Sequence, residues 1–138
     1  MKKISVSILL TSFLFIKNAN CQNVNWAETS NWKLYKIHEK SAFNYSIDTL
    51  INFKFALLNN DSMRIFLSNV SIIPYEKTPL WMGFYVASCQ LNDGTIKKIE
   101  IGTYGGFFYD EKEKKYYQLP LEIRKEWLDY LADSGADL

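Results

Sequence analysis

Few side chains of this 138-residue chain have the type and spacing that catalysis needs. His38 is the only histidine, which excludes any site that needs two imidazoles, and no spacing of Cys, His and Asp resembles a zinc site or an HExxH helix. Cys89 lacks the local sequence of a papain-like or caspase-like nucleophile, so we do not expect it to form a catalytic pair with His38. The chain contains no GxSxG turn and no phosphate-binding glycine loop. We therefore expect no catalytic residue, no metal and no cofactor, and we predict that the chain is not an enzyme.

Acidic residues in the second half are the remaining candidates for catalysis. Glu100, Asp110, Glu111 and Glu113 could supply the pair of carboxyl groups that a glycosidase uses. The sequence gives no sign that any of them is held protonated at neutral pH, as the general acid of such a pair must be. The segment Asp110–Lys115 mixes both signs of charge, which is typical of a solvated turn between two strands.

Aromatic residues are the unusual part of the composition, at 16% of the chain. Rigid amphipathic rings suit a binding surface, because they lose little entropy when a partner covers them. A second layer that buries the same rings as core is the more frequent outcome for a monomer, since large exposed apolar patches are uncommon. Both interpretations stay open for the five rings that we predict as a binding site, which are Trp81, Tyr85, Tyr104, Phe107 and Tyr109.

A β-hairpin is the element that must position these rings. Trp81–Leu91 and Thr95–Tyr104 have strand-like composition, and Asp93-Gly94 between them suits a two-residue type I′ turn. That turn would pair Tyr85 with Gly102, and it would place Trp81, Tyr85 and Tyr104 on one face of the ribbon. The opposite face would be the core face, with Met82, Phe84, Val86, Ile99 and Ile101.

The remaining elements predict an α+β fold with an antiparallel meander of four to five strands, a C-terminal helix packed on one face and a short helix in the N-terminal half. The other strands are expected over Trp32–Ile37, Phe107–Tyr109 and Tyr116–Leu119. Ser46–Leu58 fits a strand and a helix equally well. Asp61 is expected to cap a short helix over Ser62–Ser68 that buries Ile65 and Phe66. The terminal helix begins at Pro120 and ends at Gly135, and its apolar stripe is Ile123, Trp127, Tyr130 and Leu131.

The first 21 residues resemble a bacterial export signal. Lys2 and Lys3 precede the apolar run Ile4–Ile16, which is too short to span a bilayer, and a polar segment follows. Small residues at Ala19 and Cys21 predict cleavage after Cys21, so that residues 22–138 form a single globular domain in the periplasm or outside the cell. A lipoprotein anchored at Cys21 is the alternative. Cleavage would leave Cys89 as the only cysteine, which we expect to be buried and inert.

The net charge of the predicted mature chain indicates which kinds of partner are expected. The leader contains three lysines and no acidic residue, so residues 22–138 carry 13 basic and 15 acidic residues, a formal charge of −2. This balance argues against a nucleic-acid partner. We predict a small exported binding module, of the inhibitor or immunity type, that occludes another protein through its aromatic sheet face. A module that binds a small molecule or a glycan is the alternative, and neither reading requires a transmembrane span in the mature chain.

Overall fold

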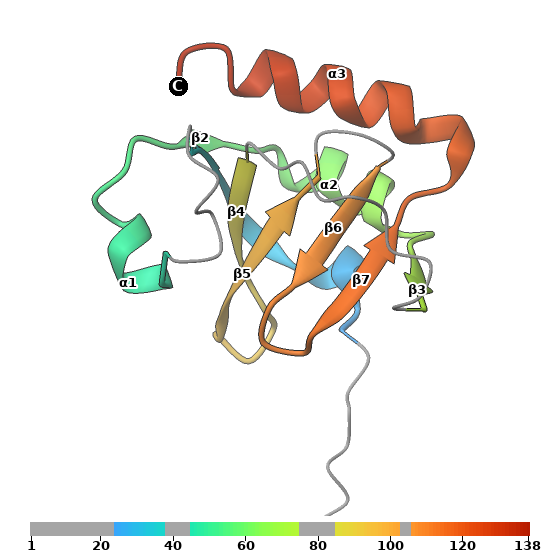
Figure 1. Ribbon diagram of the computed structural model, residues 1–138, viewed down its shortest axis with the longest axis horizontal. Coiled ribbons are helices and arrows are strands. Elements are labelled where there is room, and N and C mark those ends of the chain that lie inside the picture. Colours follow the sequence, from blue (N-terminus) through green and yellow to red (C-terminus); the bar gives the residue numbers. More distant parts are fainter. Residues whose placement is uncertain (1–23, 38–44, 75–84, 103–105) are drawn as a thin grey trace, which may run out of the picture.

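The computed structural model describes residues 24–37, 45–74, 85–102 and 106–138, and these build one antiparallel sheet with helices at its back and across one end (Figure 1). The sheet has seven strands within the described residues, in the order β2-β1-β4-β5-β6-β7-β3. The strands are β1 (Ser30–Lys36), β2 (Ala56–Leu57), β3 (Ser71–Ile73), β4 (Tyr85–Gln90), β5 (Ile96–Ile101), β6 (Phe107–Asp110) and β7 (Lys115–Gln118). The helices are α1 (Ile47–Leu50), α2 (Asn60–Leu67) and α3 (Arg124–Ser134), with 3-10 turns η1 (Trp26–Glu28) and η4 (Leu121–Ile123).

The α+β class, with one antiparallel sheet and a C-terminal helix, is confirmed, whereas the number of strands and the detail of the meander differ from the prediction. The two additional strands, β2 and β3, form the edges of the sheet and have two and three residues. Segments this short carry no readable alternation of apolar and polar residues, so only pairing with β1 and β7 makes them strands. The ambiguous segment Ser46–Leu58 accordingly divides into one helical turn, α1, and the edge strand β2.

The hairpin β4–β5 exists, but its predicted register is wrong by one residue. Tyr85 pairs with Ile101 rather than Gly102, because the loop is longer than a type I′ turn. The Gly94 N–H donates to the Leu91 carbonyl (2.9 Å), the Leu91 N–H donates to the Thr95 carbonyl (2.8 Å), and Gly94 has φ +84°. This is a three-residue loop in which a type I turn is followed by a left-handed residue. Asp93 stabilises it by accepting the Thr95 N–H at 2.8 Å.

The inner face of the sheet, which we define as the face toward α2 and η1, carries the main core. The register places Ala87, Ile99 and Phe108 on this face, with Val86 on the opposite, outer face. The prediction that Val86 shares a core face with Ile99 and Ile101 is therefore wrong. Three rings close the core beneath η1: Trp26 lies edge-on to Phe108 (centroids 5.1 Å apart) and Tyr117 (5.3 Å).

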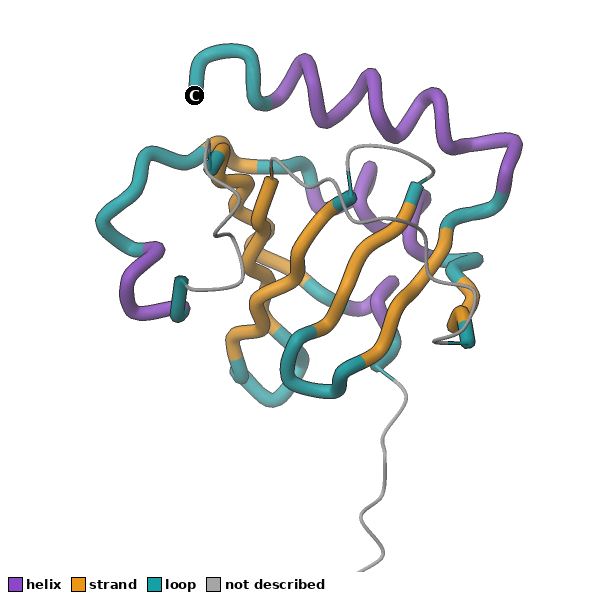
Figure 2. The backbone as a smooth tube through the Cα atoms, in the orientation of Figure 1, coloured by secondary structure: helices purple, strands orange, loops and turns teal. Residues whose placement is uncertain are grey.

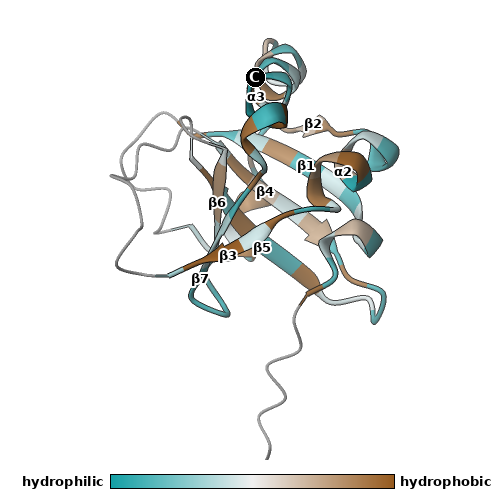
Figure 3. Cartoon of the chain, turned by 90° about the vertical axis from the view of Figure 1, so that its right-hand side faces the viewer, coloured by the Kyte–Doolittle hydropathy of each residue, from teal (hydrophilic) through white to brown (hydrophobic). Residues whose placement is uncertain are grey.

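The short helix α2 covers the inner face, and it differs in detail from its prediction (Figure 3). Its N-cap is Asn59, whose side-chain oxygen accepts the Ser62 N–H at 3.0 Å, and not Asp61. The earlier start fixes which face turns inward, so that Met63, Phe66 and Leu67 are buried, whereas Ile65 stays 70% exposed. The prediction of a buried Phe66 is confirmed and that of a buried Ile65 is wrong.

The C-terminal helix α3 runs across one end of the sheet (Figures 1 and 2). Trp127 and Leu131 enter the main core, and Ile123 and Tyr130 pack against it, as the apolar stripe predicts. Gly135 ends the helix and lies against Tyr85: a Cβ at position 135 would be 2.9 Å from a carbon of the Tyr85 ring. Across the described residues, no helix is long and apolar enough to cross a membrane.

A smaller cluster covers part of the outer face. The cluster consists of Tyr35 on β1, Ile37 just after it and Val86 on β4, which pack with Leu50 of α1. Tyr45 and Phe53 lie at its margin. The segment around α1 therefore acts as a second layer on the outer face at β1 and β4.

Candidate functional site

The predicted binding rings do not form one surface in the structure. Tyr85 lies on the inner face, where it pairs with Ile101 and packs against the core, whereas Phe107 and Tyr109 flank the core residue Phe108 and so lie on the outer face. The one-residue change of register is the cause, because it moves every side chain of β4 to the other side relative to β5. Trp81 and Tyr104 lie outside the residues that the structure describes.

Three rings remain together on the outer face of the hairpin β6–β7, and we call Phe107, Tyr109 and Tyr116 the ring strip. Tyr109 and Tyr116 face each other across the hairpin with centroids 4.5 Å apart. All three rings are only partly buried, and the Arg124 guanidinium lies 5.9 Å from the Phe107 centroid. Tyr116 was not among the predicted site residues. The signal that could have found it is the pairing of Tyr109 with Tyr116 across the charged turn.

A buried ion cluster lies beside the ring strip on the outer face. Glu100 is opposite Tyr109 in the sheet and is fully buried. Lys98 lies two residues before it, and its Nζ is 3.4 Å from the Glu100 carboxylate and 2.5 Å from that of Glu111. The Lys98 ammonium also donates to the Tyr45 carbonyl at 2.8 Å. One lysine is thus shared by two carboxylates and a carbonyl.

Glu100 receives the weakest interactions in this cluster. Among the described residues its closest polar contact is the Lys98 ammonium at 3.4 Å, which is long for a hydrogen bond. Removal from water raises the pKa of Glu100 to about 7, although the Lys98 ammonium opposes that rise. The pKa of the Tyr109 phenol is also raised, mainly by burial and then by Tyr116 and Glu100. The sequence places Lys98 near Glu100 but did not indicate this state, because the flanking strands β4 and β6 and the second carboxylate on Lys98, from Glu111, come from other parts of the chain.

The charged segment Asp110–Lys115 is not simply a solvated turn, which corrects that prediction. Asp110 is fully buried on the inner face and pairs with Lys97, whose Nζ is 2.5 Å from its carboxylate. Glu113 lies 3.8 Å from the same ammonium, and Glu111 pairs with Lys98. Lys97 and Lys98 are adjacent on β5 and point to opposite faces of the sheet, so the turn forms ion pairs with the sheet on both faces.

Cys89 is buried on the inner face, as expected for an inert thiol. Only 1% of its surface is exposed, and burial raises the pKa of the thiol to about 12. A thiol with that pKa is not ionised at neutral pH, so it is not a nucleophile there. His38 lies outside the described residues.

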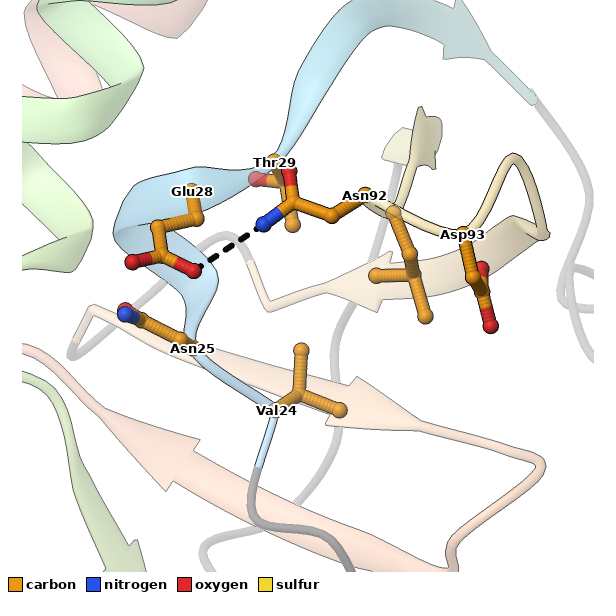
Figure 4. A pocket seen from close by; sticks show the side chains of 7 residues that line it. Val24, Asn25, Glu28, Thr29, Asn92 and Asp93 are labelled. Atoms are coloured by element: carbon orange, nitrogen blue, oxygen red, sulfur yellow. Dashed lines mark hydrogen bonds between the residues drawn. The ribbon is translucent and has the colours of Figure 1, made fainter.

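A surface pocket of about 430 Å³ separates η1 from the loop of the hairpin β4–β5 (Figure 4). Its carboxylates lie on opposite sides: Glu28 accepts a hydrogen bond from the Asn92 amide at 3.0 Å, and Asp93 caps Thr95. These groups do not converge on a common point, and the described residues contain no group of three or more His, Cys, Asp or Glu that could hold a metal ion. The Glu28–Asn92 contact joins η1 to the hairpin.

Comparison of the chain with protein-family models, with curated proteins and with solved structures found no match. The class of protein is therefore described by its fold and site alone. The fold is an α+β domain with a seven-stranded antiparallel sheet among its described residues. The site is a ring strip beside an ion cluster on the outer face of that sheet.

Proposed function

We propose that this protein is a small exported bacterial module that binds another protein and acts by occluding it. The observation that carries the proposal is the ring strip, in which three aromatic side chains remain partly exposed on adjacent strands. Aromatic residues dominate the energetics of protein interfaces, because they bury a large area with few rotatable bonds. If residues 1–21 act as the export signal that their sequence resembles, this binding takes place in the periplasm or outside the cell.

Rigidity of the hairpin supports the use of these rings for recognition. The turn between β6 and β7 is held by the pairs Lys97–Asp110 and Lys98–Glu111, and the Asp110 carboxylate accepts the N–H groups of Lys112 and Glu113. A surface that is already ordered loses little conformational entropy when a partner binds.

Capture from the native envelope tests the proposal. The tagged protein is expected to retain one partner protein in stoichiometric amount, and Phe107→Ala should weaken that capture about tenfold, as is usual for removal of an interface ring. Leu57→Ala is the matched control, because Leu57 is 73% exposed on β2 at the other edge of the sheet. If both variants retain the partner as the wild type does, the ring strip is not the contact surface.

A glycan or small-molecule ligand is the second candidate, because the Tyr109–Tyr116 pair offers a stacking platform. The described tryptophans, Trp26, Trp32 and Trp127, are at most 2% exposed, so a ligand that stacks on the Tyr109–Tyr116 pair is expected to quench tyrosine emission rather than theirs. Saturable quenching by saccharides, together with the absence of a captured protein, would favour this candidate over protein occlusion.

A further inference from the structure

A groove of about 310 Å³ runs between α2 and α3. Ile65 and Phe66 of α2 form one wall, and Glu126, Asp129, Tyr130 and Asp133 of α3 form the other. The groove is separate from the ring strip, because α2 covers the inner face of the sheet and the ring strip lies on the outer face.

The groove has an apolar floor and an apolar rim. Phe66 and Tyr130 lie against each other with ring centroids 5.5 Å apart. Ile65 stays 70% exposed on the rim, although its neighbours Phe66 and Leu67 enter the core. An exposed isoleucine beside two rings offers apolar surface that an incoming side chain could bury.

The two helices are fixed relative to each other, so the groove is already formed. The Tyr130 hydroxyl accepts the Asn59 N–H at 2.8 Å, which ties α3 to the N-cap of α2. Phe66 also lies edge-on to Trp127 at 5.3 Å, which anchors both helices in the core. A partner would therefore not have to open the groove before binding.

Every charged residue that lines the groove is acidic. Glu126, Asp129 and Asp133 follow one another along one side of α3 at helical spacing, and all three are exposed. Lys125 pairs with Asp129 at 2.6 Å, but both side chains are exposed, so the pair is worth little and another cation could replace it. The groove thus combines apolar surface with an excess of negative charge.

We propose that this groove binds a segment of another protein that presents an apolar side chain flanked by lysine or arginine, as one face of a cationic amphipathic helix does. The apolar side chain would lie against Ile65, Phe66 and Tyr130, and the cations would pair with the carboxylates of α3. This inference stands apart from the ring strip, since it uses other residues.

A labelled peptide of leucine and lysine in helical spacing tests the inference by fluorescence anisotropy. The purified full chain should bind this peptide saturably, and added salt should weaken binding. Two further peptides, one with glutamate in place of lysine and one with serine in place of leucine, should not bind, because each lacks half of the proposed chemistry.

Variants of the groove locate the binding. Ile65→Ser should weaken it about tenfold, and the double change Asp129→Asn with Asp133→Asn about fivefold. These side chains are exposed, so the fold should persist, and circular dichroism checks that it does. Ile96→Ser and Asp48→Asn are matched controls at exposed positions away from α2 and α3, and they should bind as the wild type does. Equal binding of the glutamate peptide, wild-type affinity in the groove variants, or no binding of the leucine and lysine peptide would overturn the inference.

Discussion

Glu100 is a residue whose pKa differs strongly from what its neighbours in the sequence indicate. In the sequence it is one acidic residue in the strand-like run Lys97-Lys98-Ile99-Glu100-Ile101. In the sheet it is buried between β4 and β6 and shares Lys98 with Glu111, and the Lys98 ammonium lies 3.4 Å from its carboxylate. Removal of an ionised carboxylate from water is unfavourable, so burial raises the pKa of Glu100 to about 7.

This state predicts a specific pH dependence of stability. Because the pKa of Glu100 is about 7 in the folded protein and 4.5 in an ordinary glutamate, the folded state binds more protons between these values, and the free energy of unfolding falls as the pH rises through that range. The side chain of Glu100→Gln cannot ionise, so the free energy of unfolding of this variant should not decrease over that pH range. Its stability relative to the wild type should therefore be greater at pH 8 than at pH 5 by about 2–3 kcal/mol, measured by urea denaturation. Glu122→Gln, at an exposed position, is the control. Parallel pH profiles for the wild type and Glu100→Gln would show that Glu100 is not desolvated in this way.

At the scale of the element, the loop of the hairpin β4–β5 decides which side chains face the core. Asp93-Gly94 fits either a two-residue or a three-residue loop, since both need a glycine with positive φ. The Asp93 carboxylate selects the longer loop by accepting the Thr95 N–H. The sequence signal was therefore sufficient to predict a hairpin but not its register, and the assignment of faces depended on the register.

Two substitutions test this loop, and the second of them distinguishes the registers. Gly94→Ala should destabilise the protein by about 1 kcal/mol, because Gly94 has φ +84° and alanine is strained there. Asp93→Gly should also lower the denaturation midpoint, because Asp93 has an ordinary φ and its carboxylate caps the loop. A type I′ turn would require positive φ at residue 93, so a rise in the midpoint of Asp93→Gly would contradict the three-residue loop.

The N-cap of α2 allows a second test at this scale. Asn59→Ala should cost about 1 kcal/mol, because Asn59 satisfies the Ser62 N–H at the start of the helix. Asp61→Ala should cost less, because the contact of Asp61 among the described residues is an exposed ion pair with Arg64. Thermal denaturation of the two variants compares them directly. A larger loss for Asp61→Ala would place the start of the helix where the sequence suggested.

At the scale of the whole molecule, the sequence predicts the elements that depend on neighbouring residues better than the contacts between separate segments. The hairpin, the strands β6 and β7 and the helix from Pro120 to Gly135 depend on turn residues and periodicity within a few positions, and these predictions are confirmed in outline. The edge strands depend on pairing with segments far apart in the chain. The ion pairs of Lys97 and Lys98 join β5 to the turn after β6, and the alternation within one strand does not indicate such pairs. The ring strip itself lies on the local hairpin β6–β7, of which Phe107 and Tyr109 were anticipated, and Tyr116 could have been found from its pairing with Tyr109 across the turn.

The two edge strands of this sheet, β2 and β3, are very short. The strand β2 has two residues and β3 has three, and Pro74 follows β3. Short edge strands and a proline limit pairing with the sheets of other molecules. We therefore expect partners to bind through side chains on the faces of the molecule rather than by adding a strand to the sheet.

The export prediction is tested on the whole molecule by the mass of the mature chain. Cleavage after Cys21 should give a chain that begins at Gln22, with a free or cyclised N-terminus. Intact-mass spectrometry of protein from its native envelope distinguishes this product from the alternative. A mass that retains Cys21 with attached acyl chains would show instead a lipid-anchored protein.

The most direct test of the proposed function is photo-crosslinking in the native envelope, with a photoreactive phenylalanine analogue at position 107 or, as the control, at the exposed position 57. The ring strip predicts one dominant adduct with a single protein from position 107 and none from position 57. Equal adducts from both positions, or an adduct from position 57 alone, would contradict occlusion through the outer face of β6 and β7.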